Sequence, residues 1–458
     1  METVIRAIDN FNFLKLVSFK DFALWDVKRL VAERIASVFP IVSLRDYIRE
    51  ENTKIRPALE PEKEHKILGV NNIDGIFDAY TQLGKEIKQP YKIMREGFLA
   101  YNPYRINVGS IGLKTKEHNN DLISPAYVVF SCKNGLNPDF LFKLFKTDRF
   151  NKVIRDNTTG SVRQNLTIDI LKTLEIPFPK PAEQEAILKE YYTKIEAANN
   201  LENELNKFIE TYENTLFEHL GIAKIPVKQA TNSLQFINLV NTSRWGYQYL
   251  LNHEQSERLL DTSKFPQKLL SSLVLLNPIT SFSELKKEDK ISFLPMECVS
   301  DLYGEVIEYR DGKVQSSGGY TKFQEGDLLW SKITPCMQNG KSCIVENLEN
   351  GFGYGSTEYH VIREKEDSEI HLRFLYHILR TKYVLTNATF HFTGSAGQQR
   401  VPIEFLANLN VPLPSIDEQK EISKELDKLI ADRKVKQVKV NELKEQAIKD
   451  FEAKIFKN

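Results

Sequence analysis

The distribution of apolar residues predicts two long amphipathic helices, each introduced by the same short phrase. The phrase Ile/Val-Pro-x-Pro-x-x-x-Glu-Gln occupies residues 176–184 and 411–419, which lie 235 positions apart in a chain of 458 residues. After each copy, apolar residues recur at intervals of three and four, which places them on one face of a helix. Prolines and acidic residues such as Glu183 and Asp417 favour a helix start at each phrase.

We expect the two apolar stripes to pack against each other. The seam is predicted to contain Ile187, Tyr191, Ile195, Leu205, Phe208, Tyr212, Ile422, Leu426, Leu429, Val440 and Leu443. The centre of the second stripe carries Arg433 and Lys436, which we expect to pair with acidic residues of the first helix. The alternative is that each helix packs only on its own domain. Against it, helices of ~30–40 residues would be ~45–60 Å long, longer than a domain of this size is wide.

Strand-like segments precede both helices and occur in the same order in both halves. Residues 97–101 match residues 326–330, and residues 124–130 match residues 356–362. A helical segment, a glycine-containing turn and the proline phrase then follow in each half. This colinearity predicts a tandem duplication.

The predicted fold class is α+β, with two mixed α/β domains that are each trailed by a long helix. The expected divisions are residues 1–175 for the first domain, 176–224 for its helix, 225–410 for the second domain and 411–458 for the last helix. We expect Gly221 to end the first helix as a C-terminal glycine.

Composition and charge refine this picture only slightly. The chain is 41% hydrophobic and 27% charged, as in globular proteins, and contains no apolar run long enough to cross a membrane. The net charge is zero, but residues 181–221 carry nine Glu against three Lys. An excess of basic residues is therefore left to the two predicted domains. The N-terminus lacks the features of a secretory signal, and the four scattered cysteines suit free thiols, so we expect a cytoplasmic protein.

The sequence lacks the usual signatures of catalysis. Gly340-Lys341-Ser342 resembles the end of a phosphate-binding loop, but the glycine required five residues earlier is replaced by Pro335. Asn102-Pro103-Tyr104 resembles part of an amino-methyltransferase tetrad, but a proline and the cofactor loop are missing. His371 and His377 lie in an apolar helical run, which favours packing or surface histidines over metal ligands. We therefore expect no catalytic residue, no metal and no enzyme activity in this chain alone.

Polar loops at matched places in the two halves are the candidate binding residues. Arg, Asn and Gln side chains can hydrogen-bond to purine edges in the major groove, while Gly, Ser and Thr bring backbone amides to phosphates. The candidates for DNA contact are Arg105, Asn107, Arg163, Gln164, Asn165, Lys332, Gln338, Asn339, Lys341, Gln398, Gln399 and Arg400. For each residue, the alternative is a solvated turn that fixes the structure of the domain.

These motifs resemble those of a known family. The phrases at 176–184 and 411–419, the segments 326–333 and 355–359, and the Thr-Gly-Ser turns at 159–161 and 393–395 carry the resemblance. Together they resemble the specificity subunit of type I restriction–modification enzymes, over essentially the whole chain and in the order of that family.

The resemblance implies a function that composition does not. Each domain would be a target recognition domain that reads one half of a bipartite site in double-stranded DNA. The two helices would pack as an antiparallel coiled coil with pseudo-twofold symmetry, set the gap, and dock two methyltransferase subunits and, through them, restriction subunits. S-adenosylmethionine, ATP and Mg²⁺ would be handled by those partners. Two alternatives stay open: a protein-interaction scaffold without nucleic acid, and an enzyme fused to its own recognition domain, which the missing cofactor motifs disfavour.

Overall fold

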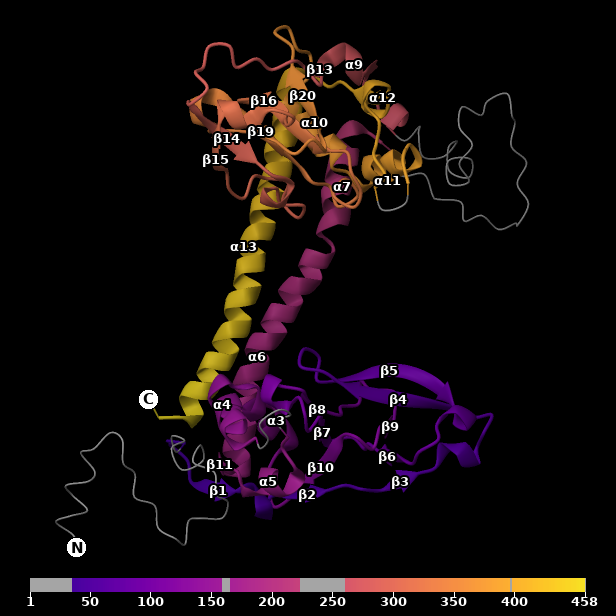
Figure 1. The fold of residues 1–458 in the computed structure, drawn as a ribbon, viewed down its shortest axis with the longest axis vertical. Coiled ribbons are helices and arrows are strands. Elements are labelled where there is room, and N and C mark those ends of the chain that lie inside the picture. Colours follow the sequence, from indigo (N-terminus) through magenta and orange to yellow (C-terminus); the bar gives the residue numbers. More distant parts are fainter. Residues whose placement is uncertain (1–34, 159–164, 223–259, 396–397, 458) are drawn as a thin grey trace, which may run out of the picture. The chain divides into compact units, whose positions relative to one another are not determined.

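The chain forms two compact units in the computed structural model, which describes residues 35–158, 165–222, 260–395 and 398–457 (Figure 1). One unit comprises Met1–Asn200 with Lys439–Asn458, and the other comprises Leu201–Val438. Each unit therefore contains a segment of both predicted spacer helices. The finer division into two domains and two helices stays a prediction.

The first unit is built on three β-sheets. A four-stranded antiparallel sheet has the order β2-β10-β7-β8, and a five-stranded sheet has the order β3-β6-β9-β4-β5, in which β4 and β9 are parallel. Strands β1 and β11 form a separate antiparallel pair. The bounds are β1 Ile41–Ser43, β2 Ile48–Glu50, β3 Lys54–Ile55, β4 Glu64–Val70, β5 Ile76–Leu83, β6 Tyr91–Ile93, β7 Leu99–Tyr101, β8 Ile111–Leu113, β9 Leu122–Ile123, β10 Val128–Cys132 and β11 Glu175–Pro177.

Short helices follow the sheets of the first unit, namely α3 (Pro138–Lys146), α4 (Asp148–Asn157) and α5 (Ile168–Thr173). The Asn137 side chain caps α3 by accepting from two backbone N–H groups, and Thr147 caps α4 in a similar way. Phe140 and Leu144 on one face of α3 are completely buried in the main core, beside Phe130 of β10.

The second unit repeats this plan. Its sheets have the orders β13-β20-β17-β18, β15-β14-β19-β16 and β12-β21. The strands are β12 Gln267–Leu269, β13 Val274–Leu276, β14 Lys290–Leu294, β15 Arg310–Lys313, β16 Thr321–Gln324, β17 Leu328–Ser331, β18 Ser342–Ile344, β19 Phe352–Gly355, β20 Tyr359–Glu364 and β21 Asn410–Pro412. The short helices are α9 (Leu270–Leu273), α10 (Leu372–Leu379), α11 (Lys382–Phe390) and α12 (Ile403–Ala407).

The internal repeat predicted from the sequence is visible in the strand order. Sheet β2-β10-β7-β8 corresponds to β13-β20-β17-β18, and the pair β1-β11 corresponds to β12-β21. In both units the first two residues of the proline phrase end the last strand. The remaining sheets differ, because the first unit has five strands where the second has four. The structure is α+β, as predicted.

Three helices carry the predicted spacer segments, and they are α6 (Pro181–Asn206), α7 (Phe208–Leu220) and α13 (Ile416–Ile455). The first spacer, expected as one helix, is interrupted at Lys207. Gly221 ends α7 in the left-handed conformation, with φ +66°, as predicted.

Within each unit the two spacer segments run in opposite directions. In the first unit, Glu190 and Lys194 of α6 form ion pairs with Lys454 and Asp450 of α13, respectively. In the second unit, His219 Nε2 lies 2.8 Å from Glu425 Oε2, and the Glu204 and Lys436 side chains also form an ion pair. In both units, residue numbers therefore rise along one helix as they fall along the other.

The predicted seam residues are at least partly buried. Ile187, Leu205, Tyr212, Ile422, Leu426 and Val440 are buried, and Tyr191, Ile195, Phe208, Leu429 and Leu443 are half-buried. In the second unit, the core cluster joins residues of α7 and α13 with residues of the domain. In the first unit, Ile187 and Phe451 share a cluster with α3. The spacer helices thus contribute to the domain cores as well, and the seam itself stays a prediction.

The two cations at the centre of the second stripe have different partners. Lys436 Nζ lies 2.6 Å from Glu204 Oε2, which confirms the predicted pairing with the acidic first helix. The Arg433 guanidinium instead lies over the Phe208 ring, 4.5 Å from its centroid, in a cation–π contact. Burial lowers the pKa of Arg433.

Candidate nucleic-acid interface

Two candidate loops come together in the first unit. One follows β7 and contains Arg105 and Asn107, and the other contains Asn165. The Leu166 N–H donates to the Pro103 carbonyl at 3.0 Å, and the buried Tyr101 hydroxyl donates to the Leu166 carbonyl at 3.0 Å. These two bonds join segments that are about sixty residues apart in the sequence.

The candidate side chains of this first loop pair differ in exposure. Arg105 is exposed, and Asn107 and Asn165 are half-buried. Tyr104 and Val108 beside them are more than half exposed. Arg163 and Gln164 lie outside the described residues.

The corresponding loops also come together in the second unit. The Thr334 N–H donates to the Gln399 carbonyl at 3.0 Å, and the Val401 N–H donates to the Lys332 carbonyl at 2.8 Å. Ile333 and Arg400 form an isolated β-bridge. The loop after β17 and the loop before α12 are thus joined in a way that matches the first unit.

The loop after β17 is held as a compact turn. The Met337 N–H donates to the Ile333 carbonyl at 2.8 Å, and the Met337 side chain is buried in the core. Gly340 adopts φ +74°, and its carbonyl accepts a hydrogen bond from Arg380. Gln338 and Asn339 at the tip are exposed, so their amides can reach a ligand.

Four further candidates in the second unit have more varied surroundings. Lys341 is half-buried, and its Nζ donates to the Met296 carbonyl at 2.9 Å. Lys332 and Gln399 are half-buried, and Gln398 is exposed. The Lys341 side chain thus makes a structural hydrogen bond that the sequence did not indicate.

Arg400 is engaged by a carboxylate from the neighbouring strand segment. Its Nε lies 2.9 Å from Glu358 Oε2, and its Nη2 lies 2.7 Å from Glu358 Oε1, a two-pronged pair. The hydrogen bond from Arg400 lowers the pKa of Glu358. The Glu358 carbonyl also accepts from the Lys332 N–H at 2.9 Å, so this residue fastens both loops. Sequence reasoning missed Glu358, although it lies in a segment that carried the family resemblance.

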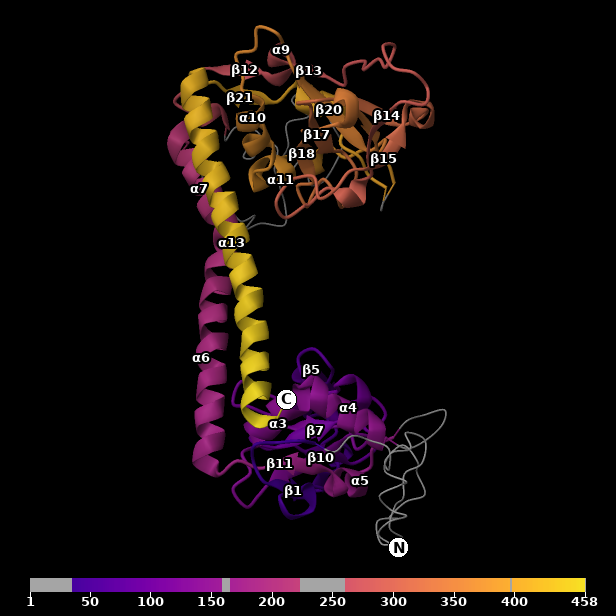
Figure 2. The same cartoon turned by 90° about the vertical axis from the view of Figure 1, so that its left-hand side faces the viewer.

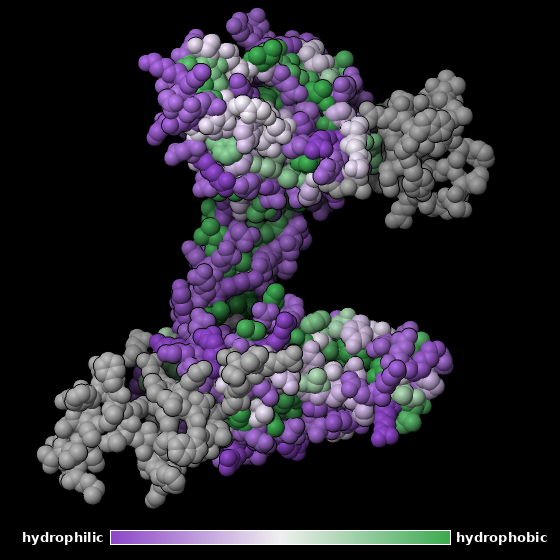
Figure 3. All heavy atoms as spheres, in the orientation of Figure 1, coloured by the Kyte–Doolittle hydropathy of each residue, from purple (hydrophilic) through white to green (hydrophobic). Residues whose placement is uncertain are grey.

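A cavity of about 970 Å³ opens beside the tip of the loop after β17. Its walls come from α7, α11, α13 and the loops near Asp301 and Asn339, and they include Phe208, Arg380 and Lys382. Ile73 and Ile279 are among the large apolar residues that are exposed elsewhere. On the face drawn in Figure 3, hydrophilic residues are interspersed with smaller hydrophobic patches.

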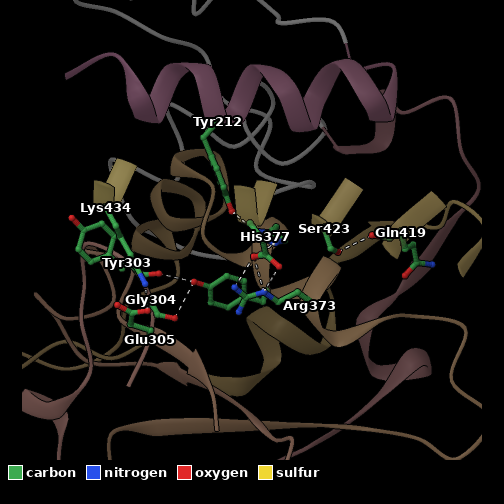
Figure 4. A network of polar contacts seen from close by, with 11 residues as sticks. Tyr212, Tyr303, Gly304, Glu305, Arg373, His377, Gln419, Ser423 and Lys434 are labelled. Atoms are coloured by element: carbon green, nitrogen blue, oxygen red, sulfur yellow. Dashed lines mark hydrogen bonds and ion pairs between the residues drawn. The ribbon is translucent and has the colours of Figure 1, made fainter. Parts of the chain in front are cut away.

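A buried polar network connects the second domain with α7 and α13. The Tyr212 hydroxyl lies 2.7 Å from His377 Nδ1, and His377 Nε2 lies 3.2 Å from Asp427 Oδ1. Arg373 Nη2 donates to Asp427 Oδ1 at 2.6 Å. Figure 4 shows Tyr212 reaching from α7 toward His377, with Arg373 on the other side, and Figure 2 shows α10 beside α7.

The electrostatics of this network follow from burial. Burial lowers the pKa of His377 to about 4, so its imidazole is neutral at pH 7. Burial alone would raise the pKa of Asp427, but hydrogen bonds from His377 and Arg373 lower it to about 2. His377 is completely buried, so of the two roles expected for it, packing or surface, it has the first. The sequence did not indicate its partners, because Tyr212 and Asp427 come from two other helices, α7 and α13.

Among the described residues, no group of His, Cys, Asp and Glu side chains is arranged to hold a metal ion. Within the same ranges, no helix has the length and apolar character needed to cross a membrane. All four cysteines have free thiols.

Two α+β units that share a strand order, and that each present two joined polar loops, define a protein of tandem modules. The sequence matches the family described as type I restriction modification DNA specificity domain over residues 97–211 and 276–445. These regions cover more than half of the chain, and the protein belongs to that family.

Curated relatives include two specificity subunits from Escherichia coli. The type I restriction enzyme EcoEI specificity subunit is 36% identical over 165 residues, and the EcoAI specificity subunit is 37% identical over 158 residues. These matches cover 35% and 33% of this chain, and 27% and 26% of the relatives, respectively. The matched region thus spans about a quarter of each relative.

The fold is related to that of one solved structure, and a second solved structure gives a lower score. A structure described under complex assembly and conformational transition of the type I R-M system has a TM-score of 0.55 at 15% identity, covering 92% of this chain and 98% of that one. The HsdS subunit from Thermoanaerobacter tengcongensis gives a TM-score of 0.47 at 15% identity, covering 90% and 95% of the two chains. The first of these likenesses supports the α+β fold.

Proposed function

We propose that this protein is the sequence-specific DNA-binding specificity subunit of a type I restriction–modification complex. Each unit reads one half of a bipartite site in double-stranded DNA. The chain has no catalytic role of its own. It determines the DNA sequence at which the partner subunits act.

The joined loops carry this proposal. In both units a loop that leaves the matched strand, β7 or β17, is hydrogen-bonded to a second loop that lies about sixty residues further along the chain. Exposed Arg105 in one unit, and exposed Gln338, Asn339 and Gln398 in the other, supply the donors and acceptors that read base edges. The different residues in the two pairs suit two different half-sites.

Long helices support a fixed gap between the half-sites. Helix α13 contains 40 residues and is therefore about 60 Å long. One turn of duplex is about 34 Å. We expect half-site centres at least about one turn apart, set by the spacer helices packed as an antiparallel coiled coil with pseudo-twofold symmetry.

The partners follow from the same proposal. Charged residues on the outer faces of α6 and α13 dock two methyltransferase subunits and, through them, restriction subunits. S-adenosylmethionine, ATP and Mg²⁺ belong to those subunits. The protein acts in the cytoplasm, where it meets DNA.

Binding measurements with a co-expressed methyltransferase subunit test the proposal. A gel shift compares fragments of the host genome with random DNA of equal length, with and without the methyltransferase. The proposal predicts selective binding that depends on the methyltransferase. Equal binding to all fragments, or no binding with the partner present, would contradict it and favour a scaffold protein.

A further inference from the structure

The two units contain a matched joint between domain and spacer helices. Gln184 of α6 accepts from the Asn137 N–H at 2.8 Å, and Gln419 of α13 accepts from the His371 N–H at 2.8 Å. These anchors align α3 with α10 and the start of α6 with the start of α13. Corresponding residues can therefore be compared position by position.

Four matched positions carry different side chains. The first joint consists of Asp139, Lys143, Tyr192 and Ala447. The matching residues of the second joint are, in the same order, Arg373, His377, Asp427 and Tyr212. The first two positions of each set lie on the domain helix, and the others lie on the two spacer segments. Ala447 and Tyr212 each lie four residues before a buried core residue, Phe451 and Leu216.

In the second joint the domain helix carries the cation. Arg373 forms a two-pronged ion pair with Asp427, in which Nε and Nη2 lie 2.9 Å and 2.6 Å from Oδ1. His377 lies between Asp427 and Tyr212: its Nδ1 is 2.7 Å from the Tyr212 hydroxyl, and its Nε2 is 3.2 Å from Asp427 Oδ1. The carboxylate of this joint thus comes from the spacer helix.

In the first joint the domain helix carries the carboxylate. Burial and a hydrogen bond to Asp139 raise the pKa of the Tyr192 phenol. Lys143 Nζ lies 5.1 Å and 5.3 Å from the ring centroids of Tyr191 and Tyr192. The spacer helix here contributes phenols and no carboxylate to the contact.

We propose that these two polar sets form a pairing code that restricts each recognition domain to its own spacer surface. If the first domain docked on the start of α13, Asp139 would take the place of Arg373 opposite Asp427, and Lys143, in the place of His377, would leave one of the two carboxylates without a cation. If the second domain docked on the start of α6, Arg373 would meet Tyr192 and lose its carboxylate. Unpaired or like charges at a partly buried contact are unfavourable. A duplicated chain therefore avoids misassembly of its similar halves.

Exchanging the residues of the second joint tests the code in the full-length chain. Asp427→Tyr alone should lower the midpoint of thermal unfolding, because it leaves Arg373 without its partner. In a chain that already carries Arg373→Asp, His377→Lys and Tyr212→Ala, the same substitution should raise the midpoint by roughly 3–5 °C, since it completes the set of the first joint. Lys428→Tyr, at an exposed neighbouring position, is the control and should act alike in both backgrounds.

The reciprocal exchange covers the case in which the multiple variant does not fold. Tyr192→Asp should lower the midpoint of the natural chain and raise that of the Asp139→Arg chain, because it then supplies an ion pair. Thr193→Asp adds the same charge one residue further on and should show no such reversal. If Asp427→Tyr and Tyr192→Asp each have the same effect in both backgrounds, the joints do not discriminate and the proposal is wrong.

Discussion

The Oε1 atom of Gln419 accepts a hydrogen bond from the backbone N–H of His371 at 2.8 Å. Its Nε2 group donates to the carbonyls of Glu369 and Pro414, both at 2.9 Å, and the side chain is completely buried. Gln184 makes the equivalent three bonds in the first unit, to Asn137, Gly135 and Pro179. The last residue of the repeated phrase thus fastens each spacer helix to its domain.

The preceding glutamate has a separate role. Glu183 accepts from the Lys180 N–H at 2.7 Å, and Glu418 accepts from the Ser415 N–H at 2.9 Å. Both therefore satisfy a backbone donor at the first turn of a helix, as in a capping box. The phrase combines a helix start with a domain anchor, which explains why it occurs once per domain.

Replacing either buried glutamine with alanine should destabilise the protein. Gln184→Ala and Gln419→Ala each leave a buried N–H and two carbonyls without their partner, which we expect to cost roughly 2–4 kcal/mol of unfolding free energy. Urea unfolding measures the loss. The exposed neighbours Glu185→Ala and Lys420→Ala are the matched controls and should change stability by less than about 0.5 kcal/mol. If the glutamine variants and the control variants lose equal unfolding free energy, the glutamines do not anchor the helices.

Acidification should weaken the second unit between pH 6.5 and pH 4. Burial lowers the pKa of both His360 and His377 to about 4, whereas an unfolded histidine titrates near 6.5. In this window the unfolded chain binds more protons, so unfolding becomes more favourable as pH falls. We expect a loss of roughly 1–2 kcal/mol per histidine between pH 7 and pH 5.

Chemical denaturation at a series of pH values measures this dependence. His360→Gln and His377→Gln should each flatten the slope between pH 5 and pH 7, whatever their effect on stability at pH 7. Asp427 does not contribute in this window because its pKa is about 2. If the slope of stability against pH is unchanged in both variants, the two histidines are not the source of the pH dependence.

Arg400→Ala should affect one half-site only. Arg400 fastens the second loop pair through Glu358, and its loss should allow the loops after β17 and before α12 to move. We expect selectivity at the second half-site to fall by roughly tenfold while the first half-site is unaffected. Competition binding with oligonucleotides altered in one half at a time measures both values. Equal losses of selectivity at both half-sites would show that Arg400 contributes to the stability of the protein and not to the reading of one half-site.

Shortening a spacer helix tests its role as a ruler. Deleting four residues from α6, about one turn or ~6 Å, should shorten the unspecified gap between half-sites by one or two base pairs. Selection from a library of sites with variable gaps reads out the preferred length. An unchanged gap with normal affinity would show that the helices do not set the spacing.

The sequence predicted those features that depend on local patterns. The repeated order of elements in the two halves, the helices that begin in the two proline phrases and the terminal Gly221 follow from the internal repeat, the apolar periodicity and the backbone conformation. The network of Tyr212, His377 and Asp427 could not be predicted, because it requires the packing of three helices. The same holds for the Glu358–Arg400 pair, which depends on how two loops meet.

One expectation failed for a local reason. The apolar stripe continues from Leu205 to Phe208 and predicts an unbroken helix, but the helix is interrupted at Lys207. The spacing of apolar side chains stays the same when one backbone position is irregular, so it cannot reveal such an interruption.

A map of methylated adenines in the host genome shows whether this protein directs methylation to a bipartite site. The map is compared between cells with the natural gene, cells without it, and cells in which the exposed Gln338 and Asn339 are both replaced by alanine. If this protein is a DNA-specificity subunit, a bipartite methylated sequence should disappear without the gene, and the variant should show a relaxed second half with an unchanged first half and gap. A methylation pattern that is identical in all three would contradict the assignment of this protein as a DNA-specificity subunit.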